Sequence, residues 1–120
     1  MVSNESDTFD LNGDLTVHRL GYGAMRITGE EIIGPPEDEA AAHDVLQHAV
    51  DLGVDFIDTA DSYGPGVSER LIGEALDMDE VVVATKAGLL RERGGEWLPH
   101  GDPDYIRNQV LVSRDRLGVD

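Results

Sequence analysis

The spacing of hydrophobic residues changes repeatedly along the chain, and the changes predict strands followed by helices. Apolar residues recur at helical spacing over residues 37–53, 66–76 and 102–118. Short runs rich in β-branched residues precede the last two of these segments, at 54–60 and 80–88. Because strands that alternate with helices pair in parallel, the pattern predicts an α/β protein.

The ends of the predicted helices carry suitable capping residues. Acidic residues 37–39 lie where the positive end of the first helix dipole favours them, and Gly53 suits its C-terminal cap. Asp102 and Pro103 predict the N-cap and first turn of the third helix. The predicted apolar stripes are Ala42, Val45, Leu46, Ala49 and Val50, then Leu71, Ile72, Ala75 and Leu76, then Ile106, Val110 and Leu117.

The remaining segments are shorter. Residues 8–20 predict a β-hairpin, because Asn12-Gly13 is the favoured two-residue turn. A short strand is predicted within 20–27, a loop over 91–102, and the start of another strand at 118–120.

This order of elements favours one fold class over another. The sequence GYGAM lacks the third glycine of a dinucleotide-binding fingerprint and opens no helix directly, so a doubly wound sheet is disfavoured. A (β/α)8 TIM barrel fits better, although it needs roughly 250 residues. We therefore expect an N-terminal hairpin and the first three βα units of an incomplete barrel. They would form one domain over residues 1–120, with 1–10 as a flexible acidic start.

Charge and composition narrow the environment and the partners. The chain has 25 acidic and 9 basic residues, a net charge of −16, which repels nucleic acids and anionic membranes. The scattered acids and the single lysine, Lys86, are typical of a protein adapted to high salt; an ordinary acidic cytosolic protein is the alternative. There is no cysteine, so disulfides and thiolate metal sites are not available and the redox compartment is not constrained. There is no apolar run of about 20 residues and no signal-peptide pattern, so a cytoplasmic location is expected.

Three polar side chains follow predicted strand ends and carry the candidate chemistry. Asp58 and Lys86 come at the ends of neighbouring strands, which lie about 4.8 Å apart, so the two can reach each other. Tyr63 lies in the loop after Asp58. An ammonium stabilises the phenolate form of a nearby tyrosine and makes the tyrosine a better general acid. Such a group could protonate a developing alkoxide while a hydride reaches the carbonyl carbon.

Each of these residues also has an ordinary structural interpretation. Asp58 could cap a loop, Tyr63 is common turn material, and Lys86, flanked by apolar residues, would be poorly solvated and need a partner. Trp97 could anchor a loop or form part of a substrate rim, and Arg26 could meet a cofactor phosphate or a surface acid. The other histidines fit no metal pair: His43 and His48 are five apart on a helix surface, and His18 decorates the hairpin, so no metal site is expected.

The segment GVDFIDTADSYGPGVSERLIGEAL closely resembles the signature of the aldo/keto reductase family, and the likeness extends over about residues 15–120. The resemblance implies a (β/α)8 barrel that uses NADPH, or less often NADH, to reduce aldehydes and ketones. It implies that Asp58, Tyr63 and Lys86 are catalytic, with Tyr63 as the acid. Gly23, Ala24 and Met25 would border the nicotinamide, and Asp58 would also lie against the cofactor.

Part of the family pattern is not matched. The family's catalytic histidine follows the fourth strand, and its main phosphate- and adenine-binding segments lie further on; His100 does not match that histidine. Two hypotheses follow. The chain is part of a reductase, with a small carbonyl substrate and a complementary C-terminal half, or it is a non-catalytic remnant or a cofactor-binding regulatory subunit. The identity of the substrate is not predicted.

Overall fold

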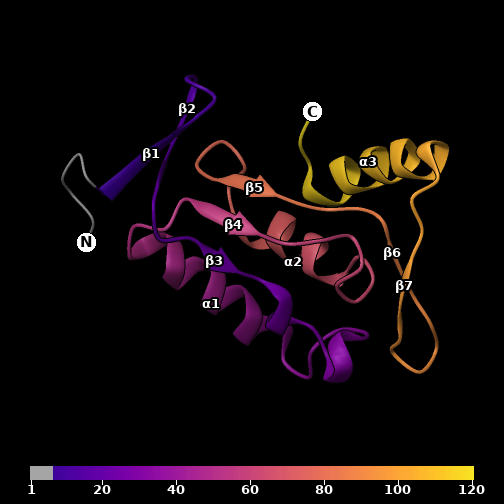
Figure 1. Ribbon diagram of the computed structural model, residues 1–120. Helices are drawn as coiled ribbons and strands as arrows, with labels where there is room; N and C mark the ends of the chain where they lie inside the picture. The colour runs from indigo at the N-terminus through magenta and orange to yellow at the C-terminus, as the bar shows by residue number, and fades with distance from the viewer. Residues whose placement is uncertain (1–6) are drawn as a thin grey trace.

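Three short parallel strands lie at the centre of the structure, a computed structural model that describes residues 7–120 (Figure 1). They are β3 (Tyr22–Gly23), β4 (Phe56–Asp58) and β5 (Val82–Ala84), and they form one sheet in the order β3-β4-β5. The register pairs Gly23 with Asp58 and Asp58 with Ala84. Within the described residues both edges of this sheet are open, so the predicted parallel α/β arrangement is confirmed as part of a barrel that does not close.

A helix follows each strand of the sheet, as predicted. The helices are α1 (Glu39–Asp51), α2 (Val67–Ala75) and α3 (Pro103–Leu117). Asp38 caps α1 by accepting from the Ala41 amide at 3.0 Å. The predicted cap of α3 is also confirmed, because the Asp102 carboxylate accepts from the Asp104 amide at 2.9 Å.

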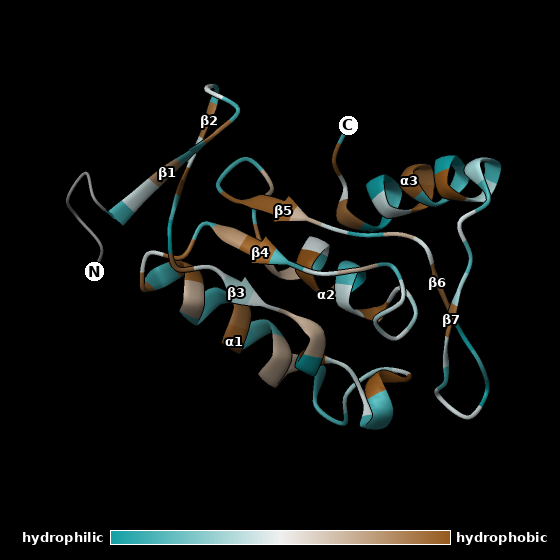
Figure 2. Ribbon diagram, viewed as in Figure 1, coloured by the Kyte–Doolittle hydropathy of each residue, from teal (hydrophilic) through white to brown (hydrophobic). Residues whose placement is uncertain are grey.

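The hydrophobic core lies between the sheet and the helices. Leu46 of α1, Ile57 of β4, and Leu71 and Ile72 of α2 have no exposed surface. Figure 2 shows the corresponding hydrophobic ribbon along β4 and β5 and hydrophilic residues in the turn between β6 and β7. Helices α2 and α3 approach closely at Gly73, where a Cβ atom would lie 2.5 Å from the Arg116 carbonyl oxygen.

Some of the predicted apolar stripes face solvent. Val45 of α1 is 46% exposed and Val110 of α3 is 51% exposed. Val110 borders an open pocket beside Thr85 and Ala87, on the side where β5 is the edge of the sheet. The sequence of β5 is apolar on both faces and suggests a fully buried strand. The strand is only half-buried, because it lies at the edge of the sheet.

Two antiparallel hairpins stand beside the sheet (Figure 1). The first, β1 (Thr8–Leu11) with β2 (Leu15–His18), is confirmed, although its turn spans residues 12–14 rather than the two predicted. Asn12 and Gly13 both have positive φ, as that turn prediction requires. The second hairpin, β6 (Leu89–Arg91) with β7 (Trp97–Pro99), replaces the predicted loop. Most residues of its two strands are apolar, but each strand is only three residues long, which is too short to show the alternation that hydrophobic periodicity detects.

Three further expectations need correction at the ends of segments. Residues 8–10 belong to β1, so the predicted flexible start is wrong there, and residues 1–6 lie outside the described part of the chain. The strand predicted in 20–27 is only Tyr22–Gly23, followed by a 3-10 turn at Met25–Ile27. Residues 118–120 form no strand, because Gly118 ends α3 in a left-handed conformation and no partner strand adjoins it within residues 7–120.

His18 has a structural role that its sequence context did not suggest. Its amide donates to the Asp55 carboxylate at 2.8 Å, and its ring Nδ1 lies 3.1 Å from the other carboxylate oxygen. Asp55 immediately precedes β4, so these contacts attach the first hairpin to the start of the parallel sheet.

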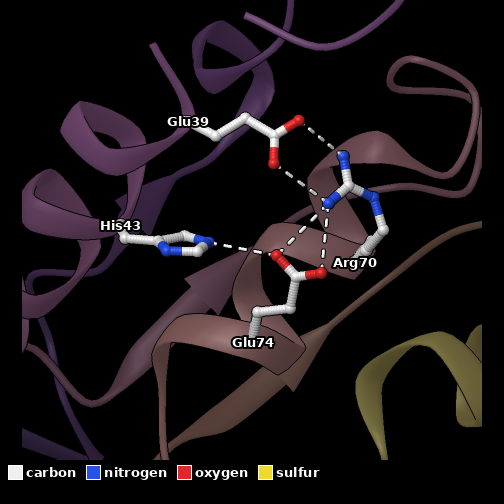
Figure 3. A network of polar contacts seen from close by, with 4 residues as sticks. All are labelled: Glu39, His43, Arg70 and Glu74. Atoms are coloured by element: carbon white, nitrogen blue, oxygen red, sulfur yellow. Dashed lines mark hydrogen bonds and ion pairs between the residues drawn. The ribbon is translucent and has the colours of Figure 1, made fainter.

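The outer faces of α1 and α2 are joined by a polar network (Figure 3). Arg70 donates to both carboxylate oxygens of Glu39, at 3.2 and 3.0 Å, and to Glu74. His43 reaches Glu74 at 3.1 Å, which agrees with its predicted surface position. The hydrogen bond from Arg70 lowers the pKa of Glu39. Within the described residues, no helix is long and apolar enough to cross a membrane.

Candidate active site

Asp58 and Lys86 meet at the carboxyl ends of β4 and β5. The Lys86 ammonium donates to the Asp58 carboxylate at 2.9 Å and to the Thr59 carbonyl oxygen at 2.7 Å. The predicted contact between these two residues is therefore confirmed. Their side chains remain open to solvent, 57% exposed for Asp58 and 51% for Lys86.

Backbone hydrogen bonds continue past the strand ends and set the positions of these residues. The Ala24 amide donates to the Asp58 carbonyl at 2.9 Å, which keeps β3 against β4. On the other side, the Asp61 amide donates to the Lys86 carbonyl at 3.0 Å. The loop after β4 is thus bonded to the segment after β5, and this brings Lys86 beside the loop that carries Tyr63.

Tyr63 is half-buried next to Lys86. The ammonium lies 5.5 Å from the centre of the Tyr63 ring, and the Trp97 ring meets Tyr63 edge-on with 6.2 Å between centroids. Tyr63 and Lys86 line one pocket of about 220 Å³. The other residues that line this pocket are Ala60, Asp61, Ser62, Ala87, Gly88 and Leu89. A tyrosine and a cation therefore border a mostly apolar space, the usual character of a small-molecule pocket.

The environment of Lys86 differs from the prediction. Its apolar neighbours in sequence suggest a poorly solvated lysine, but half of the side chain is exposed. The reason is that β5 is an edge strand of the sheet within residues 7–120, so no strand beyond it covers the lysine.

The segment predicted to border a nicotinamide has mixed accessibility. Gly23 is exposed, and a Cβ atom there would meet nothing within 4 Å, so there is open space beside Asp58 for a flat ring. Met25 is half-buried. Ala24 has no exposed surface and lies in the core, so a ligand at this edge would contact its neighbours and not Ala24 itself. Arg26 is exposed. These residues fit the nicotinamide end of a cofactor.

Buried hydrogen bonds that sequence analysis did not detect support the loop between β4 and α2. The Ser68 hydroxyl donates to the Ala24 carbonyl at 3.0 Å and lies 2.7 Å from the Thr59 hydroxyl. All three residues are buried, so these bonds connect the first turn of α2 to the loops after β3 and β4. Serine and threonine at these positions gave no sequence signal, because hydroxyl residues are equally common in exposed loops.

Asp61 is a buried carboxylate two residues before Tyr63. It is 3% exposed and accepts a hydrogen bond from the Gln109 amide at 2.9 Å. Burial raises the pKa of this carboxyl group above its ordinary value of 3.8, which disfavours its charged form. The Gln109 contact also attaches α3 to the Tyr63 loop.

His100 lies away from the candidate site. His100 is exposed and packs edge-on against Tyr105, with 4.7 Å between ring centroids, and it is not among the residues lining the Tyr63 pocket. Residues 7–120 contain no group of three or more histidine, aspartate and glutamate side chains placed to hold a metal ion.

Comparison with known proteins gives a consistent result. The profile of the aldo/keto reductase family matches residues 19–120. Over 108 residues the chain is 49% identical to an uncharacterised oxidoreductase of Schizosaccharomyces pombe, covering 89% of this chain and 35% of that protein. It is 43% identical over 117 residues to pyridoxine 4-dehydrogenase of Escherichia coli, covering 96% and 41%. It is 37% identical over 113 residues to the NADP(+) aldo-keto reductase yakc of S. pombe, covering 90% and 32%.

The fold agrees with the sequence matches. Glycerol dehydrogenase from Gluconobacter oxydans superimposes with a TM-score of 0.82 at 33% identity, covering 97% of this chain and 37% of that one. The structural neighbours are (β/α)8 barrels, so the hairpin and three βα units correspond to the first part of such a barrel. The chain spans between about a third and two fifths of the length of the relatives it matches. The chain belongs to the aldo/keto reductase family, and it corresponds to the N-terminal part of that fold.

Proposed function

We propose that this chain is the N-terminal part of an aldo/keto reductase that reduces aldehydes or ketones to alcohols with a nicotinamide cofactor. The observation that carries the proposal is the arrangement of Asp58, Lys86 and Tyr63. Asp58 and Lys86 form a solvent-exposed ion pair at the ends of two adjacent strands. The Lys86 ammonium lies beside the ring of Tyr63, and both residues line the same pocket. Barrel enzymes keep their active sites at this end of the strands.

In the proposed mechanism Tyr63 is the general acid. A reduced nicotinamide supplies a hydride when it is bound. As the hydride adds to the carbonyl carbon, the C=O π pair moves to oxygen, and the Tyr63 hydroxyl gives its proton to that oxygen. The product is an alcohol, and Tyr63 is left as a phenolate that regains a proton from solvent. The Lys86 ammonium stabilises the phenolate, and Asp58 holds the ammonium in place.

The cofactor would lie with its nicotinamide against Gly23, Met25 and Asp58. The open space at Gly23 supports this placement. We propose NADPH, because a relative that is 37% identical carries NADP(+) in its name, with NADH as the alternative. Comparing the dissociation constants of the two reduced cofactors would distinguish these alternatives.

Pyridoxal and pyridoxine are the first substrates to test. The relative with 43% identity is named for the oxidation of pyridoxine, and its match covers nearly the whole of this chain. A panel that includes a simple aliphatic aldehyde and an aromatic aldehyde would define the class of carbonyl compound.

The test of Tyr63 needs a whole barrel. Residues 1–120 would be joined to a C-terminal part taken from the natural coding sequence or, as a chimera, from E. coli pyridoxine 4-dehydrogenase; we call this protein the completed enzyme. We expect Tyr63→Phe and Lys86→Met to lower kcat about 10²- to 10⁴-fold, since each removes proton-transfer catalysis. Cofactor oxidation with an aldehyde measures this. Tyr105→Phe, which removes a hydroxyl outside the pocket, is the control, and equal losses in all three variants would contradict the proposal.

The alternative is that the chain alone is a non-catalytic remnant or a cofactor-binding subunit. Both edges of the sheet are open in residues 7–120, and open edges with apolar faces favour association. We expect residues 1–120 alone to show no reductase turnover and no cooperative unfolding as a monomer. Circular dichroism and Trp97 fluorescence during heating would test this. A single sharp transition in a monomer, or turnover that Lys86→Met abolishes, would show that the prediction is wrong.

We also propose that the protein works in a cytoplasm rich in salt. The net charge of −16 and the single lysine support this, because salt screens the repulsion between the many acidic side chains of the surface.

A further inference from the structure

Arg91 connects the β6–β7 hairpin to the loops of the candidate site. Its Nη1 donates to the carbonyl oxygens of Ile32 at 2.7 Å and Ser62 at 3.2 Å. Its Nη2 donates to the carbonyl oxygen of Glu31 at 2.7 Å. Nη2 and Nε also donate to Gly95 within the hairpin, at 2.9 and 3.3 Å. One guanidinium therefore joins the loops that follow β3, β4 and β5.

The loop after β3 has a backbone that benefits from this support. Glu31 and Ile32 both have positive φ, 59° and 60°, which side chains disfavour and β-branched side chains disfavour most. Their carbonyl groups are the two that Arg91 holds in this loop. Gly64, next to Tyr63, is bonded to the same loop, because its amide donates to Ile32 and its carbonyl accepts from Gly34.

Arg91 also contacts the aromatic ring that lies against Tyr63. Its Cζ atom is 3.7 Å from the centre of the Trp97 ring. Trp97 is 38% exposed and meets Tyr63 edge-on at an interplanar angle of 86°. A planar guanidinium can stack on a ring while its edges make hydrogen bonds, and a lysine cannot do both. Arg91 thus holds Trp97 against Tyr63, which lines the pocket.

We propose that Arg91 is a positioning residue that holds Trp97 as an aromatic wall next to Tyr63, and that this wall favours carbonyl compounds carrying a flat aromatic ring. This inference rests on the proposed function of Tyr63. The other pocket residues near Tyr63 include Ala60, Ala87 and Leu89, which offer no aromatic surface. Trp97 is not one of the residues that line this pocket, but it is 38% exposed and stands edge-on to Tyr63, so it would supply an aromatic surface at the rim of the pocket. Arg91 fixes the orientation of that surface.

The experiment compares Arg91→Lys with Arg93→Lys in the completed enzyme. Arg93 is an exposed arginine in the turn of the same hairpin, so its replacement is the matched control. We expect Arg91→Lys to raise KM for benzaldehyde about tenfold and to leave kcat within about twofold, since the wall contributes binding rather than proton transfer. KM for propanal, which is too small to reach the wall, stays unchanged, and Arg93→Lys changes neither constant.

Trp97→Ala separates positioning through Trp97 from a general effect on folding. It should raise KM for benzaldehyde as Arg91→Lys does, and the double variant should show no further increase, because both changes remove the same wall. Equal loss of kcat for both aldehydes in Arg91→Lys would indicate a merely structural role and overturn the proposal. Unchanged KM values would overturn it as well.

A second measurement does not depend on activity. Trypsin cleaves after Arg93, and release of the hairpin should speed this cleavage about tenfold in Arg91→Lys, which keeps a basic residue at position 91. If the unmodified completed enzyme reduces no carbonyl compound, the proposed function fails, and the trypsin result alone decides whether Arg91 holds the hairpin. Equal cleavage rates would show that it does not.

Discussion

The ion pairs Asp58–Lys86 and Glu69–Arg116 have similar lengths and opposite surroundings. Their N–O distances are 2.9 and 3.0 Å. The side chains of the first pair are 57% and 51% exposed, whereas Glu69 has no exposed surface and Arg116 is 28% exposed. The two pairs are connected through consecutive residues: Thr85 donates to Glu69 at 2.5 Å, and the next residue is Lys86.

The difference in exposure indicates that the Glu69–Arg116 pair stabilises the fold and that the Asp58–Lys86 pair is available to a ligand. Glu69 accepts from Arg116 of α3 and from Thr85 after β5, so the buried pair joins three elements and its acceptors are occupied. The exposed ammonium of Lys86 has three hydrogens and, within residues 7–120, two acceptors. The open pair therefore keeps capacity for a bound molecule, and in this chain burial marks the structural pair rather than the candidate catalytic one.

The largest expected effect on stability is that of Glu69→Ala. It leaves the Arg116 guanidinium and the Thr85 hydroxyl without their partner, so we expect a loss of about 3 kcal/mol in the free energy of unfolding. Lys86→Met should cost less than about 1 kcal/mol, because the pair it breaks is open to water. Urea denaturation of the completed enzyme measures both. Glu74→Ala, an exposed glutamate on the same helix, is the control, and similar losses for Glu69 and Lys86 would remove the distinction between the pairs.

Asp61 extends the comparison to a buried carboxylate that has an amide partner instead of a close cation. Because burial raises its pKa, the folded state binds the proton more tightly than the unfolded state does. Its contribution to stability is therefore present at low pH and is lost as the pH rises above 3.8 through the folded-state value. Asp61→Asn keeps an acceptor for Gln109 and does not titrate. We expect this variant to gain stability relative to the parent as the pH rises above 3.8.

The control for Asp61→Asn is Asp104→Asn, an exposed aspartate whose change should leave the pH profile as it is. Thermal unfolding at several pH values follows both variants. A difference between Asp61→Asn and the parent that is independent of pH would indicate that Asp61 affects stability only through its hydrogen bond.

The smallest effect is expected in the surface network of Arg70, Glu39 and Glu74. These side chains are 39–44% exposed, so Arg70→Ala should cost about 0.5 kcal/mol at low salt and less in 2 M KCl. The parent protein itself should become more stable in 2 M KCl, since salt screens its net charge of −16. Urea midpoints at both salt concentrations test this. A parent that loses stability in concentrated KCl would contradict adaptation to high salt.

Much of the candidate site could be predicted from the sequence because local order implies it. Asp58 and Lys86 follow strands that are consecutive in the parallel sheet, so a chain that alternates strand and helix places both residues at one edge. The N-cap at Asp102 depends only on nearby residues and was confirmed for the same reason. The roles of Asp58, Tyr63 and Lys86 in catalysis stay predictions.

The contacts of Arg91 could not be predicted, because they join residues about 30 and 60 positions apart through backbone carbonyls. A carbonyl group is present at every residue, so its position carries no signal in the sequence. The burial of Glu69 is similar. Its sequence context is a surface-like acidic position in a short helix, and it is covered because α3 and the segment after β5 pack against that helix.

By itself the sequence determined the family, the parallel α/β order and the three residues grouped at the strand ends, because these depend on hydrophobic spacing and on motifs within short segments. Only the tertiary structure decided that Lys86 is open to solvent, that Ala24 lies in the core and that Trp97 stands against Tyr63. Exposure depends on which elements cover a residue, and this follows from packing between segments that are distant in the chain.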